Sequence, residues 1–148
     1  MGGSGALGDI FSAILSKTKL HVVITKGYHL PNTVDSKTLV VAISISGNTV
    51  ETLSVLDSAR KTDAKIIAFS SGGIMEKYCK KHNIEYRNVP QFHSPRASFT
   101  AFLFSILRVL NPVLPIKHSD VLKSIKELER LKKKISSENL NRSNPALE

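Results

Sequence analysis

The chain has 148 residues, 41% of them hydrophobic and 22% charged, which is typical of a soluble globular protein with room for one domain. Its formal charge of +9 favours anionic ligands, although much of the excess lies in residues 117–134. One cysteine, Cys79, excludes an internal disulfide framework, and no apolar run reaches the ~18–20 residues that cross a bilayer. We therefore expect a cytoplasmic protein that binds no membrane.

The chain starts with the glycine-rich sequence MGGSGALG, which leads into a predicted helix over residues 6–15. A glycine loop that opens a helix is an arrangement that binds phosphate groups. The spacing of these glycines matches neither the dinucleotide fingerprint nor the P-loop, and a flexible tag is the alternative interpretation.

Two apolar runs rich in β-branched residues, 20–25 and 39–43, predict strands buried in a parallel sheet. The second run is followed by three hydroxyl residues in six positions: Ser44, Ser46 and Thr49. A predicted helix starts at residue 50. Backbone N–H groups, the positive helix end and these hydroxyls would converge on a small anion such as phosphate. The alternative is an ordinary capped turn between a strand and a helix.

The later segments continue the alternation of strands and helices. We predict strands over 64–70 and 85–89, and helices over 74–82, 95–110 and 119–135. This order specifies an α/β fold, a doubly wound and mostly parallel sheet flanked by helices, with an amphipathic helix near the carboxyl terminus. In such sheets ligands bind beyond the carboxyl ends of the strands, where the hydroxyl-rich loops fall.

Pro95 is predicted to be the first residue of the helix over 95–110, and Ser94 its cap. This places Arg96 in the first turn of that helix. A cation there opposes the helix dipole, so we expect an anion to offset it, either a ligand or a local carboxylate. His93, on the same loop, is a less favoured candidate for a general acid. The five histidines show no metal-binding spacing, and no nucleic-acid-binding motif is present.

The segment 44–52, SISGNTVET, resembles the phosphosugar-binding signature of sugar isomerase (SIS) domains. Within that superfamily, the start MGGSG followed by Gly8-Asp9, and the later sequence PRAS at 95–98, are similar to the bifunctional phosphoglucose/phosphomannose isomerases of archaea and some bacteria. Even Asn144-Pro145-Ala146 is similar to the linker into the second SIS domain of that family.

The resemblance implies a flavodoxin-like SIS domain over residues 1–113, without its first strand, and a helix with a linker over 114–148. It implies aldose–ketose interconversion of glucose or mannose 6-phosphate with fructose 6-phosphate through a cis-enediol, without a cofactor. Ser44, Ser46 and Thr49 would bind the phosphate group, and Gly3 and Ser4 would line the sugar. Arg96 would stabilise the enediolate.

In that family the general base comes from the second SIS domain, so we expect this chain to be a truncated member that is incomplete alone. The expected partners are a phosphorylated hexose and either a second SIS domain or a second copy of the chain. A sugar-phosphate sensor without catalysis is the main alternative, and an amino-sugar SIS domain is a weaker one. The preference between glucose and mannose stays open.

Overall fold

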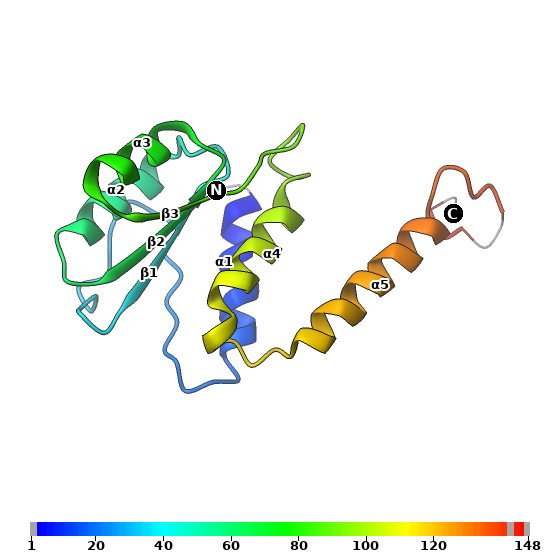
Figure 1. Cartoon of the computed structure of the whole chain (residues 1–148), viewed down its shortest axis with the longest axis horizontal. Coiled ribbons are helices and arrows are strands. Elements are labelled where there is room, and N and C mark those ends of the chain that lie inside the picture. The colour runs from blue at the N-terminus through cyan, green and yellow to red at the C-terminus, as the bar shows by residue number, and fades with distance from the viewer. Residues whose placement is uncertain (1–2, 142–143, 147–148) are drawn as a thin grey trace. The chain divides into compact units, whose positions relative to one another are not determined.

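The structure is a computed structural model that describes residues 3–141 and 144–146 (Figure 1). Residue contacts divide the chain into two units, Met1–Leu114 and Pro115–Glu148. The first unit contains a parallel sheet of three strands in the order β1-β2-β3. The strands are β1 (Leu39–Ile43), β2 (Lys65–Ser70) and β3 (Glu85–Asn88). Each lies within one residue of a predicted strand.

Helices cover both faces of this sheet, as Figure 1 shows. One side carries α2 (Val50–Arg60) and α3 (Gly73–His82), and the other carries α1 (Gly3–Leu15) and α4 (Phe99–Leu110), which contact each other. The short 3-10 helix η1 (Asn111–Val113) follows α4. Two helical layers around a parallel sheet confirm the predicted α/β class.

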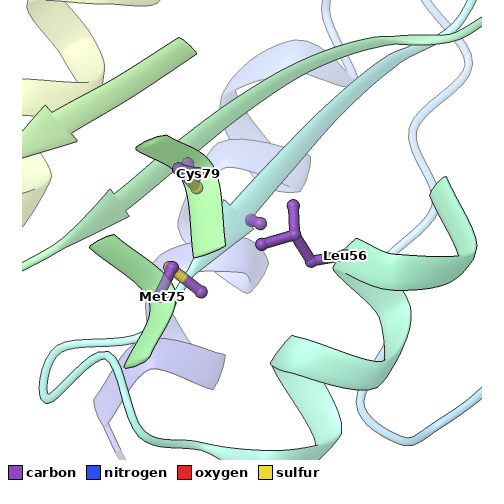
Figure 2. Close-up of a cluster of buried hydrophobic side chains, with 5 residues drawn as sticks. Leu56, Met75 and Cys79 are labelled. Atoms are coloured by element: carbon purple, nitrogen blue, oxygen red, sulfur yellow. The ribbon is translucent and has the colours of Figure 1, made fainter. Parts of the chain in front are cut away.

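Alternation along the strands divides the core between the two faces. Ala42 and Ala68, paired across β1 and β2, are buried under α2 and α3. Figure 2 shows the side chains from the two helices that cover them: Leu56, Met75 and Cys79. Burial raises the pKa of the Cys79 thiol to about 11, so this cysteine is a packing residue.

A polar network joins α2 to α3 at the edge of this core. The Tyr78 hydroxyl donates to Asp57 Oδ1 at 2.5 Å and accepts from Arg60 Nε at 3.0 Å. Lys61 Nζ lies 2.7 Å from Asp57 Oδ2. The hydrogen bonds from Lys61 and then from Tyr78 are the main reasons that the pKa of Asp57 falls to about 2.

The strand predicted over residues 20–25 is wrong. Within the described residues this segment joins no sheet, and Leu20 and Val23 are half exposed. It lies against α1 instead: the Ile24 side chain packs at Gly8, and Lys26 forms an ion pair with Asp9 at 2.6 Å. An apolar β-branched run predicts burial, whereas a strand also needs a neighbour for its backbone groups.

The second unit contains α5 (His118–Lys134), which confirms the predicted amphipathic helix to within one residue. None of its described residues is buried. The apolar side chains Ile125, Leu128 and Leu131 are between 36% and 51% exposed. Burial of this stripe against a partner stays a prediction. No helix in the described part of the chain is long and apolar enough to cross a membrane.

Candidate anion-binding site

The hydroxyl group of Ser44 lies inside the loop between β1 and α2. Ser44 is fully buried, and its backbone N–H donates to the carbonyl of Phe69 at 3.0 Å. Its Oγ accepts the N–H of Gly47 at 3.1 Å and lies 2.8 Å from Thr49 Oγ1. Each hydroxyl has one hydrogen to donate, and one hydrogen suffices for the bond between them. When Ser44 donates this bond, the hydrogen of the half-buried Thr49 hydroxyl is left over.

The amino-terminal end of α2 begins at this hydroxyl pair. Thr49 occupies the N-cap position with extended backbone angles, φ −69° and ψ 114°, and within the described residues its side chain makes no capping bond. The N–H of Leu53 donates to Thr49 O at 3.0 Å. The three amides before it, at residues 50–52, therefore precede the helical ladder and form the positive end of the helix.

Ser46 lies at the rim of the same loop. It is exposed, and its Oγ accepts the N–H of Asn48 at 3.3 Å, which leaves its hydroxyl hydrogen to donate. The structure thus brings Ser44 and Thr49 into contact, with Ser46 on the solvent side of the loop.

A second loop, residues 71–72 between β2 and α3 with the flanking Ser70 and Gly73, packs against the first. The N–H and the hydroxyl of Ser71 both donate to the carbonyl of Ile45, at 3.0 Å and 2.6 Å. The N–H of Met75 donates to the carbonyl of Gly47 at 2.9 Å. These bonds fix the backbone of the hydroxyl-rich loop against the loop before α3.

Two glycines make this close approach of the loops possible. Gly47 has φ +70°, and a Cβ there would lie 1.8 Å from the carbonyl oxygen of Gly72. Gly73 has φ +74°, and a Cβ there would lie 2.6 Å from Ser46 O. Positive φ and the missing side chain are both required, so only glycine fits these positions without strain.

The predicted start of α4 is wrong by one turn. The helix begins at Phe99, whereas Ser94 and Pro95 belong to a separate turn before it. The N–H of Ala97 donates to Ser94 Oγ at 3.2 Å, and the N–H of Ser98 donates to Ser94 O at 3.1 Å. Ser94 therefore caps a local turn, while Ser98 occupies the N-cap position of the helix.

Arg96 is exposed in this turn and is not in the first helical turn, so the expected opposition to the helix dipole does not arise there. The ion pairs found among the described residues do not include Arg96. The segment that carries it leaves β3 beside the second loop. Val89 N–H donates to Ser70 O at 2.9 Å, and Ser71 Oγ lies 3.3 Å from Gln91 Oε1.

The glycine-rich start is helical where the structure describes it. Helix α1 begins at Gly3, so Gly3 and Ser4 form its first turn and not a loop before it; Met1 and Gly2 lie outside the described residues. Its buried stripe of Leu7 and Phe11 explains the early start, because packing favours a longer helix. In Figure 1 this end of α1 lies toward the carboxyl ends of the strands.

The predicted site residues therefore lie in three segments, which are the loop over 44–49, the first turn of α1 with Gly3 and Ser4, and the turn that carries Arg96. Ser44, Ser46 and Thr49 share one loop, and no hydrogen bond found among the described residues joins Ser4 or Arg96 to that loop. The loop offers neutral donors, namely hydroxyls and free amides, which suit an oxyanion. Among the residues described, no cluster of His, Cys, Asp or Glu can hold a metal ion.

Sequence reasoning missed Asn48 and the structural role of Ser71. Asn48 Oδ1 accepts the N–H of Ile74 at 3.0 Å, although the two residues are 26 positions apart. Asparagine is a common helix cap, which is the only signal that the sequence offers. Asn48 precedes α2 in the sequence but caps α3.

Comparison of the sequence with known proteins shows which family the chain is similar to. A sequence model of the SIS domain family matches residues 1–110. The bifunctional phosphoglucose/phosphomannose isomerase of Caldicellulosiruptor bescii is 38% identical over 120 residues, which are 76% of this chain and 35% of that protein. The protein of the same name from Aquifex aeolicus is 36% identical over 137 residues, 90% of this chain and 42% of that protein.

A third relative carries a different name. D-glucosamine-6-phosphate 4-epimerase of Sulfolobus acidocaldarius is 33% identical over 112 residues, 75% of this chain and 35% of that protein. This chain spans 35–42% of the length of these curated relatives. The matches confirm the resemblance to the bifunctional isomerases. With three quarters of its length matched by the family, the chain belongs to the SIS domain family.

Proposed function

We propose that this chain is the sugar-phosphate-binding SIS domain of an aldose–ketose isomerase, which interconverts glucose 6-phosphate and mannose 6-phosphate with fructose 6-phosphate. The observation that carries the proposal is the hydroxyl pair of Ser44 and Thr49 beside the open amino-terminal end of α2. Relatives named as phosphoglucose/phosphomannose isomerases support the choice of substrate.

In this proposal the phosphate group lies at residues 44–52. Its oxygens accept hydrogen bonds from the free hydroxyl hydrogens of the loop and from the amides of residues 50–52. The helix dipole contributes roughly 0.3–1 kcal/mol to holding the negative charge. Phosphate binding then fixes the sugar, so that its C1 and C2 are oriented for proton transfer.

Arg96 is proposed to stabilise the negative charge of the enediolate, and Gly3 and Ser4 to contact the sugar. The proton moves between C1 and C2, and the base that moves it is proposed to come from a second SIS domain or a second copy of the chain. The site is proposed to act in the cytoplasm, in the metabolism of hexose phosphates.

The proposal is tested by calorimetric titration of the chain with fructose 6-phosphate. Thr49→Val removes a hydroxyl of the pair while keeping the shape of the side chain, and Ser124→Ala on α5 is the control. We expect Thr49→Val to weaken binding about tenfold, as for the loss of a hydrogen bond to a charged group, and Ser124→Ala to bind like the wild type. Equal affinities for all three proteins contradict the assignment.

A coupled assay of fructose 6-phosphate formation distinguishes the isomerase from a sensor. Binding without turnover, alone and with the rest of the isomerase supplied by a relative, selects the sensor. Turnover that Arg96→Ala leaves unchanged removes the assigned role of Arg96. A third possibility follows from the 33% identical relative named as a glucosamine-6-phosphate epimerase. Tighter binding of glucosamine 6-phosphate than of fructose 6-phosphate would favour it.

A further inference from the structure

Two helices begin at the interlocked loops, and their amino-terminal amides differ in what they donate to. In α3, the N–H of Ile74 donates to Asn48 Oδ1 at 3.0 Å and the N–H of Met75 donates to Gly47 O at 2.9 Å. Both acceptors belong to the loop before α2. The start of α3 is therefore closed by another loop, whereas α2 has no side-chain cap among the described residues.

The side chains before α2 are directed to other partners. Thr49 occupies its N-cap position, where a threonine hydroxyl ordinarily accepts an N–H of the first turn. Here its Oγ1 is paired with Ser44 Oγ, and the neighbouring Asn48 side chain caps α3. Two residues with high capping propensity thus leave the amides of α2 to another acceptor.

The start of α3 is built to receive a cap from outside. Its N-cap residue is Gly72, which has no side chain to provide an acceptor. A Cβ on Gly73 would lie 2.6 Å from Asn48 Oδ1, so the carboxamide reaches Ile74 only because residue 73 is glycine. The fit of Asn48 at this helix start is therefore specific in shape, through Gly73, as well as in hydrogen bonding, through Ile74.

We propose that Asn48 is a positioning residue of the phosphate site. By capping α3 it closes that helix end to anions and holds the 44–49 loop so that the amides of α2 are the ones presented to the ligand. The identity of the ligand rests on the proposed function, whereas the capping role rests on the hydrogen bonds alone.

The test follows individual amides of the full, 15N-labelled chain by NMR during titration with inorganic phosphate. In the wild type we expect the amides of residues 50–52 to shift and those of Ile74 and Met75 to stay in place. In Asn48→Ala, the Ile74 amide loses its acceptor, exchanges faster with solvent, and shifts with phosphate. Binding at residues 50–52 weakens about threefold to tenfold, the effect of one hydrogen bond that positions the loop.

Two further variants separate the capping role from general damage. Asn48→Asp keeps an acceptor oxygen at the same position, so Ile74 should keep the slow exchange of the wild type. Asn32→Ala, an exposed asparagine elsewhere, is the matched control and should change neither exchange nor phosphate shifts. If Asn48→Ala does not fold, the wild-type titration still decides whether the start of α3 is closed to anions.

Several outcomes overturn the inference. Phosphate shifts at Ile74 in the wild type as large as those at residues 50–52 would show that α3 is open to anions. Unchanged exchange of Ile74 in Asn48→Ala would show that the carboxamide is no cap. If phosphate shifts no amide of either helix, the proposed function fails, while the exchange rates of Ile74 still report on the cap.

Discussion

Replacing Gly47 by alanine tests the interlock of the two loops most directly. Alanine at φ +70° costs roughly 1–2 kcal/mol because its Cβ crowds the backbone in the left-handed region. The new methyl group would also lie 1.8 Å from Gly72 O and 2.8 Å from Gly72 C, whereas real Cβ contacts stay beyond 3.0 Å. The loops must separate, which strains or breaks the bond from Met75 N–H to Gly47 O, worth about 0.5–1.5 kcal/mol.

The sum predicts that Gly47→Ala lowers the free energy of unfolding by about 1.5–3.5 kcal/mol. For a unit of this size that corresponds to a fall in melting temperature of about 10 °C. The measurement is urea denaturation followed by tyrosine fluorescence, with the slope m checked for each variant.

Gly27→Ala is the matched control. A Cβ there meets nothing within 4 Å, and its φ is not positive. It should therefore leave stability unchanged or raise it by up to about 1 kcal/mol, through the reduced entropy of the unfolded chain. Equal stability of Gly47→Ala and Gly27→Ala would refute the reasoning from backbone contact.

Three further predictions concern the core and its polar border. Leu56→Ala, at a fully buried position, should lower the unfolding free energy by about 2–5 kcal/mol in urea denaturation, whereas Leu122→Ala, 48% exposed on α5, should change it by less than about 0.5 kcal/mol. Because the pKa of Asp57 is lowered to about 2, its contribution to stability is present above about pH 4 and is lost as the pH falls through 2. The difference in unfolding free energy between the wild type and Asp57→Asn should therefore shrink over that range. A difference that stays constant would contradict the hydrogen bonds described for Asp57. Cys79, whose buried thiol has a pKa raised to about 11, should resist iodoacetamide at pH 8 and react once urea unfolds the protein, as followed by mass spectrometry.

The elements that the sequence predicted correctly are those that follow from apolar runs or helical periods within one short segment. The strand Leu39–Ile43, the helix Val50–Arg60 and the helix His118–Lys134 follow from runs and periods within a few residues of each other. The hydroxyl-rich turn was predictable for the same reason, since it lies between two such elements. Its residues were identified from a motif that is contiguous in the sequence.

The errors arose where distant or side-chain contacts decide the structure. Residues 20–25 have the composition of a strand, but their packing against α1 is not visible in the sequence. Helix α4 begins at Phe99 and not at Pro95, because the hydroxyl and the carbonyl of Ser94 accept hydrogen bonds within a separate turn before the helix. The cap from Asn48 to Ile74 joins residues 26 positions apart, and no local pattern announces such a bond.

The lack of any buried residue on α5 has a thermodynamic consequence for that helix. Isolated helices of about 12–15 residues are marginal in water, and α5 has 17 residues with none buried. Its basic last turn, Lys132–Lys134, complements the dipole but adds only a few tenths of a kcal/mol to about 1 kcal/mol per charge. Helix α5 should therefore fray gradually on warming, which would give a steady slope in far-ultraviolet ellipticity below the cooperative transition of the sheet. A surface that buries the apolar stripe of α5 should make the helix melt cooperatively instead.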